Sequence, residues 1–176
     1  MAEVLGRNQG PTKLDYCDID NVVLADGLRG NSRLKSWSPS LSVSREVRNR
    51  EVLAIAGALR ENKGLVDLNL VDLDLWHEYT MGDETWDGVC DSLKTHPTLQ
   101  VLNFGRTSLD PTVLRSRIQA LVDMLKVNMS IHTIRLLDPC CEHDVFRGSV
   151  VPYLETNWLR RASSAVQMVQ EPTFAT

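Results

Sequence analysis

Four short segments of the chain share one order of hydrophobic and polar positions. Each begins with a leucine, has a polar residue three positions later, and ends with Leu or Ile after three more positions. The segments span residues 28–34, 59–65, 93–99 and 125–131, and their central residues are Asn31, Asn62, His96 and Asn128. A pattern that recurs at nearly regular intervals indicates an array of structural repeats that stack on one another.

A second hydrophobic pattern follows each of these segments. From Leu65, for example, apolar residues occupy 68, 70, 73 and 75, which fits L-x-x-L-x-L-x-x-(N/C/T)-x-L. Two apolar residues two positions apart lie on one face of a strand. The pattern predicts five strands, entered at Leu14, Leu34, Leu65, Leu99 and Ile131, with the Leu34 copy weaker because only Trp37 and Pro39 keep the spacing.

The segments between the strands have helical spacing. One predicted apolar helix face consists of Val47, Val52, Leu53, Ala56 and Leu59, and another of Val113, Leu114, Ile118, Leu121, Val122 and Leu125. Parallel strands need crossovers of about this length, usually helical. The repeated Asn falls just beyond each helix, where we expect it to adopt the left-handed conformation that ends helices.

This combination resembles leucine-rich repeats of the ribonuclease-inhibitor type, over roughly residues 14–154. The resemblance implies an α/β solenoid, a short curved horseshoe with parallel strands on the concave face and helices on the convex face. Members of that family mostly bind other proteins inside cells. The expected function is therefore a non-enzymatic protein-interaction module; the alternative is a regulator of a partner enzyme, such as a GTPase activator.

The repeats predict one domain over residues 1–161, whereas residues 162–176 have little pattern and are expected to form a flexible tail. Terminal repeats of a solenoid need polar outer faces, and neither end of this array has one. The expectations are that the chain is part of a longer repeat protein, is a degenerate copy within its family, or self-associates through its ends. Trp158 is expected to shield the open end.

The composition limits the classes of partner and the cellular location that we expect. The net charge is −4, and Lys and Arg alternate with Asp and Glu, so no basic stripe points to nucleic acid. The sequence contains no 18-residue apolar run and no signal sequence. We therefore expect a cytoplasmic location and no membrane contact. The four cysteines lack the spacing of a disulfide framework, which favours reduced thiols.

Catalytic and metal chemistry have little support. The cluster from Cys140 to His143 lacks the second ligand pair of a structural zinc site, and His77-Glu78 has no second histidine. We therefore expect no metal and no cofactor. An enzyme that uses Cys140 or His143 remains a third, disfavoured interpretation, because no orienting group or oxyanion site is recognisable.

The candidate partner-binding residues lie between the apolar strand positions and in the long segment 71–85. Five short strands cover about 330 Å², less than the roughly 800 Å² per partner of a standard interface. We therefore expect segment 71–85 to add area through its aromatic residues. The candidates are Tyr16, Asp18, Lys35, Asp67, Asn69, Trp76, Tyr79, Gln100, Asn103, His132 and Arg135.

Overall fold

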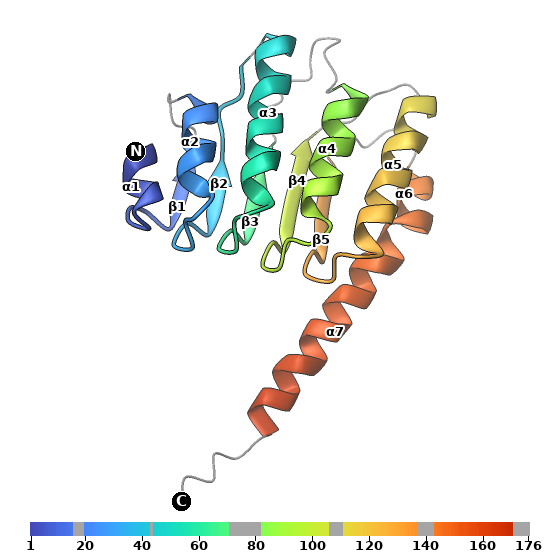
Figure 1. The fold of residues 1–176 in the computed structure, drawn as a ribbon. Helices are drawn as coiled ribbons and strands as arrows, with labels where there is room; N and C mark the ends of the chain where they lie inside the picture. The colour runs from blue at the N-terminus through green and yellow to red at the C-terminus, as the bar shows by residue number, and fades with distance from the viewer. Residues whose placement is uncertain (16–19, 43, 71–81, 106–110, 137–142, 171–176) are drawn as a thin grey trace, which may run out of the picture.

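The computed structural model describes residues 1–15, 20–42, 44–70, 82–105, 111–136 and 143–170. Strands and helices alternate along the chain (Figure 1). The helices are α1 (Ala2–Gly6), α2 (Asn21–Leu28), α3 (Arg45–Leu59), α4 (Asp83–Leu93), α5 (Pro111–Leu125), α6 (His143–Ser149) and α7 (Val151–Gln170). The strands are β1 (Lys13–Asp15), β2 (Ser36–Ser38), β3 (Asp67–Asn69), β4 (Val101–Gly105) and β5 (Thr133–Leu136).

The five strands form one parallel sheet in sequence order. Helices α2 to α5 lie side by side in a second layer against one face of this sheet (Figure 1). Each strand–helix unit therefore stacks on the next one along the chain, as the repeated pattern predicts.

The aliphatic positions of the repeats form one shared core. Leu68 pairs in register with Leu102, and Leu102 pairs with Ile134. These three side chains are 0%, 0% and 7% exposed. Because they recur at the same place in every repeat, each repeat covers the apolar face of its neighbour.

The first repeat has a different register from the one that the sequence predicts. Leu14 pairs with Trp37, not with Leu34, so Leu14 is the central apolar residue of β1 and not the entry to a strand. The position equivalent to Leu34 is occupied by Pro11. The first repeat is therefore three residues longer than the sequence pattern indicates, because its apolar entry residue is missing.

The predicted apolar face of α3 is partly wrong. Val52, Ala56 and Leu59 are buried, but Val47 is half-buried and Leu53 is 46% exposed. The covered face of this helix also contains Arg48 and Glu51, both buried. Glu51 accepts hydrogen bonds from Asn21 Nδ2 and from the backbone N–H of residue 42. Polar contacts between repeats thus replace part of the expected apolar stripe.

The repeated asparagines do not end the helices in a left-handed conformation. Asn8 is the one non-glycine residue with positive φ in the described part of the chain. Asn62 is fully buried; its Oδ1 accepts from the backbone N–H groups of Gly64 and Leu65, and its Nδ2 donates to the carbonyls of Leu28 and Asn31. The side chain therefore shapes its own turn and joins it to the preceding repeat.

Other repeats use the same arrangement. Asn31 donates to the carbonyl of Leu5, Asn128 donates to the carbonyls of Leu93 and His96, and Asn157 donates to those of Asn128 and Ile131. We call this buried row, Asn31, Asn62, His96, Asn128 and Asn157, the amide ladder. Since each amide satisfies backbone groups that the core would otherwise leave unpaired, the ladder is a structural device.

His96 is the imperfect rung of the amide ladder. Its Nδ1 accepts from the backbone N–H groups of Thr98 and Leu99, at 3.4 and 3.1 Å, as the asparagine Oδ1 atoms do. Its Nε2 is buried and has no hydrogen-bond partner in the described structure. Desolvation by burial lowers the pKa of His96 to about 4, so the ring is neutral near pH 7.

The two ends of the array differ. At the N-terminal end α1 packs on α2, Leu5 is 1% exposed, and the backbone of Ala2 closely approaches Gly27. At the other end α6 and α7 pack on α5, and α7 continues away from the body (Figure 1). Residues 162–170 are thus helical, where the sequence analysis expects a tail with little pattern; the predicted flexibility of the tail stays a prediction.

Candidate protein-binding face

The side of the sheet opposite helices α2 to α5 carries two rows of side chains, which we call the strand face. Both rows follow from the register of the five strands. The first row is Lys13, Ser36, Asp67, Val101 and Thr133; the second is Asp15, Ser38, Asn69, Asn103 and Arg135. Four of the predicted binding residues, Asp67, Asn69, Asn103 and Arg135, therefore share one surface.

Burial distinguishes the two sides of the strands except at Ser38 in β2, which is 7% exposed. Leu68 is 0% exposed, whereas Asp67 and Asn69 on either side of it are half-buried. Asn103 is likewise half-buried and Arg135 is exposed. Because successive side chains of a strand point to opposite faces, the alternation shows that the polar rows lie opposite the core.

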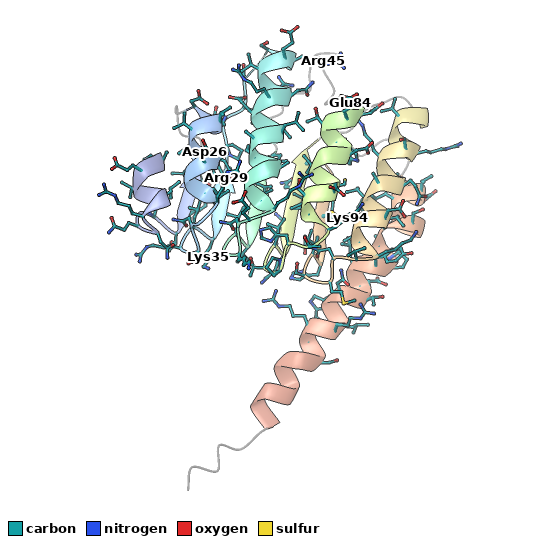
Figure 2. The ribbon with its side chains drawn as sticks, viewed as in Figure 1. Asp26, Arg29, Lys35, Arg45, Glu84 and Lys94 are labelled. Carbon is teal, nitrogen blue, oxygen red and sulfur yellow. The ribbon has the colours of Figure 1, made fainter. Side chains whose placement is uncertain are left out.

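Three predicted binding residues lie just before the strands and have structural roles as well. The carbonyl of Lys35 accepts from the backbone N–H of Asp67, and that of Gln100 accepts from the N–H of His132. The Lys35 ammonium also donates to the carbonyls of Ser32 and Gly64, at 2.6 and 3.2 Å. Figure 2 shows Lys35 at the edge of the body where the helix-to-strand turns gather. Its side chain joins two consecutive turns.

The charges of the strand face change along the array. In β1, Lys13 Nζ lies 2.7 Å from Asp15 Oδ2, so the two charges neutralise each other at the surface. The middle of the face carries the carboxylate of Asp67, and the last strand carries Arg135. The face is therefore acidic at its centre and basic at its last strand, a mixed pattern that suits a protein surface better than a polyanion.

His132 adds a titratable group beside the last strand. Burial, and then the nearby Arg161 guanidinium, lower the pKa of His132 below its ordinary value. Arg161 Nη1 lies 3.4 Å from His132 Nε2. A neutral imidazole accepts a hydrogen bond at this nitrogen, so the pair contributes one positive charge near pH 7.

Four predicted binding residues lie outside the described residues: Tyr16, Asp18, Trp76 and Tyr79. The chain enters the segment with Trp76 and Tyr79 directly after Leu70, at the carboxyl end of β3, and leaves it at Gly82, the N-cap of α4. The segment therefore follows directly on the strand face at β3 and ends at the start of the helix layer. Its contribution to binding stays a prediction.

Six members of the strand face are not among the predicted binding residues: Lys13, Asp15, Ser36, Ser38, Val101 and Thr133. For β1 the cause is the wrong register, since an entry at Leu14 places Lys13 before the strand. The signal that finds them is the period of two counted outward from the buried central residues, Leu14, Trp37, Leu68, Leu102 and Ile134.

The helix layer offers less to a partner, because its charges pair with one another. Arg29 on α2 forms an ion pair with Glu61, which follows α3, and Arg60 Nη2 lies 3.1 Å from Asp91 Oδ2 on α4. Figure 2 shows Asp26 and Arg29 on this layer, away from the strand face. These exposed pairs join consecutive repeats, each with a contribution of about 0–1 kcal/mol.

No catalytic or metal arrangement emerges from the described residues. They contain no group of three or more metal-capable side chains, and Cys140 to Glu142 lie outside them. Cys90 is a free, buried thiol whose pKa burial raises to about 12, so it is not a nucleophile near pH 7. Among the described helices, none is both long and apolar enough to cross a membrane.

Comparisons with known proteins support the fold and leave the family open. No family model and no curated protein sequence matches the chain. A solved structure, leiomodin-1 actin-binding site 2, aligns with a TM-score of 0.73 over 96% of this chain and 94% of that chain, at 18% sequence identity. A likeness at this identity shows the fold alone.

The strand–helix repeats, the single parallel sheet and this structural match agree on one architecture. The ribonuclease-inhibitor subtype that the sequence analysis suggests is not confirmed by them. The chain is an α/β solenoid of the leucine-rich-repeat type.

Proposed function

We propose that this chain is a non-enzymatic protein-interaction module that presents its strand face and segment 71–85 to a protein partner. The observation that carries the proposal is the pair of polar rows on the strand face, where side chains from five repeats lie in register opposite the core. Such a surface is continuous and rigid because the buried aliphatic positions and the amide ladder hold its backbone.

The size of the strand face supports a role for the adjoining segment. Strands of three to five residues, five abreast, cover about 200–330 Å², and a standard interface covers roughly 800 Å² per partner. A partner that binds tightly therefore contacts more than the sheet. Trp76 and Tyr79, residue types enriched at binding hot spots, lie in the segment that begins beside β3.

Actin is the first partner to test, because a solved actin-binding site has the same fold. The experiment measures binding of the purified chain to purified monomeric actin. In parallel, cross-linking and mass spectrometry identify any other protein that the chain captures. Affinities for the recovered partner then compare Asp67→Lys, on the strand face, with Asp26→Lys, on the helix layer.

The two lysine substitutions are chemically matched, and Asp26 is exposed on α2. We expect Asp67→Lys to weaken binding by about tenfold or more, since like or unpaired charges at a binding face cost several kcal/mol, and Asp26→Lys to leave it unchanged. Equal affinities of the two variants contradict a role for the strand face. Unchanged affinity of Trp76→Ala/Tyr79→Ala removes the segment from the proposal.

The alternative is that the chain regulates a partner enzyme. The identity of the recovered partner determines how this alternative is tested. If that partner is a GTPase, its nucleotide turnover with and without this chain decides between regulation and simple binding.

A further inference from the structure

Helix α7 packs on the body mainly through its first half. Val150 and Leu154 are 0% and 8% exposed, and the buried Asn157 amide donates to the carbonyls of Asn128 and Ile131. The C-terminal part of the helix projects away from the layered body (Figure 1). With 20 residues, α7 is about 30 Å long, so close to two thirds of it extends past its last ladder contact.

The projecting part begins with large apolar side chains in water. Trp158 and Leu159 are 56% and 58% exposed. An isolated helix of this length is marginally stable in water. Two adjacent large apolar side chains that are more than half exposed mark a candidate interaction site.

The same helix borders an open apolar hollow of about 540 Å³. The hollow lies between α7 and β5, which is the edge strand of the sheet that the described residues form. Ile134, Val151 and Leu154 line its inner part, and Trp158 and Leu159 line its outer part. One surface therefore provides both protruding side chains and the depression that can receive them, which is the self-complementarity that a two-fold interface requires.

The charges on α7 match the same symmetry. Glu155 precedes Trp158 by three residues and Arg161 follows it by three. When two copies of α7 cross antiparallel about a two-fold axis at Trp158, Glu155 of each copy faces Arg161 of the other. Within the described part of the chain Glu155 forms no ion pair, and Arg161 lies beside the His132 ring and not beside a carboxylate.

We propose that this chain forms a two-fold homodimer through α7, with Trp158 and Leu159 of each copy seated in the hollow between α7 and β5 of the other. In this antiparallel arrangement residues 151–165 of the two helices overlap, and a stretch about 22 Å long and 10 Å wide gives a footprint of about 220 Å² per copy. The hollow and the exposed Val127 and Met129 of the preceding turn enlarge it. The total stays below that of a standard interface, so dimerisation is weak and depends on concentration.

The test measures the mass of the full chain by sedimentation equilibrium at concentrations from about 1 to 300 µM, a range suited to weak association. We expect a rise from one 19.8 kDa chain towards twice that mass. Trp158→Ala raises the dissociation constant by about tenfold or more, as truncation of a central aromatic does. Val23→Ala, at an apolar residue of similar exposure on α2, is the matched control and leaves it unchanged.

Exchanging the charges of Glu155 and Arg161 distinguishes loss of the dimer from loss of the fold. Glu155→Arg and Arg161→Glu each weaken the dimer, because each places like charges opposite one another, and the double variant restores it. The proposal is overturned if the chain stays monomeric over the whole concentration range or forms species larger than a dimer. It is also overturned if Trp158→Ala and Val23→Ala change the dissociation constant equally, or if the double variant dimerises as weakly as the single variants. Circular dichroism of each variant verifies that the fold is retained.

Discussion

The side-chain amide of Asn128 donates to the backbone oxygen of His96 at 3.0 Å. The Nε2 atom of His96, in contrast, forms no hydrogen bond to the preceding repeat in the described structure. The equivalent amide of Asn62 donates to two carbonyls of its preceding repeat. The amide ladder is thus continuous on both sides of His96 and interrupted at it. The carbonyls that an amide at position 96 can reach are those of the turn around Asn62.

Replacing His96 with Asn should stabilise the fold. The Asn Oδ1 keeps the two bonds that His96 Nδ1 accepts from Thr98 and Leu99, and the Nδ2 supplies the donor that the ring lacks. We expect the free energy of unfolding in urea to rise by about 1–2 kcal/mol, the net value of one or two buried hydrogen bonds. His132→Asn, at the half-buried edge of the strand face, should change it by less than about 0.5 kcal/mol. A destabilised His96→Asn protein contradicts the ladder interpretation of this position.

Stability should depend on pH through His96. The pKa of His96 is about 4 in the folded protein and 6.5 for an ordinary histidine, so between these values the unfolded chain binds more protons. The contribution is fully present above pH 6.5 and is lost as the pH falls towards 4, by about 2–3 kcal/mol. Urea unfolding at several pH values should show this loss in the wild type relative to His96→Asn. Taking the difference between the two proteins cancels the carboxylates and His132, which titrate in both.

Removing a complete rung should be costly. Asn62→Ala leaves the backbone N–H groups of Gly64 and Leu65 and the carbonyl of Asn31 without the bonds that this amide makes to them. The carbonyl of Leu28 loses one of its two bonds and keeps the one from the backbone N–H of Asn31. We expect a loss of about 2–4 kcal/mol in the free energy of unfolding, because each buried unsatisfied group carries a desolvation penalty. Gln119→Ala, which removes an exposed amide bonded only to Asp123, is the control and should be nearly neutral. Similar losses in both variants contradict the structural role of the ladder.

Aliphatic spacing was sufficient to predict the core. Leu68, Leu102 and Ile134 recur at the same offset from the repeated segment, and only stacked repeats bury such a set completely. The same logic failed at β1, because Pro11 occupies the entry position and Leu14 imitates it three residues late. This error in register treats Leu14 as the residue before the strand and not as its central residue. Lys13 was therefore placed outside the strand, and its position in the first row was missed.

The amide ladder could not be read from spacing, because its partners lie one repeat away. A sequence pattern shows that Asn follows each helix, and local propensity then favours a left-handed cap. The bonds of Asn62 to the backbone of Leu28 and Asn31 exist only after stacking. The helical residues 162–170 at the end of α7 were expected to belong to a tail, because their sequence has little hydrophobic pattern.

The close stacking of consecutive turns leads to a last prediction, at Gly64. A Cβ built at Gly64 lies 2.4 Å from the Cα and 2.7 Å from the carbonyl oxygen of Ser32, both backbone atoms of the preceding turn. Gly64→Ala therefore forces two repeats apart, and we expect a loss of about 1–3 kcal/mol or more in thermal or urea unfolding. Gly30 is the matched control: it lies in the turn before, has no atom within 4 Å of an added Cβ, and does not have a positive φ. Gly30→Ala should be neutral or stabilising by about 0.4–1 kcal/mol, because it restricts the unfolded chain. Since the two variants make the same chemical change, a Gly64→Ala protein as stable as Gly30→Ala would mean that adjacent turns do not approach as closely as the stacked repeats require.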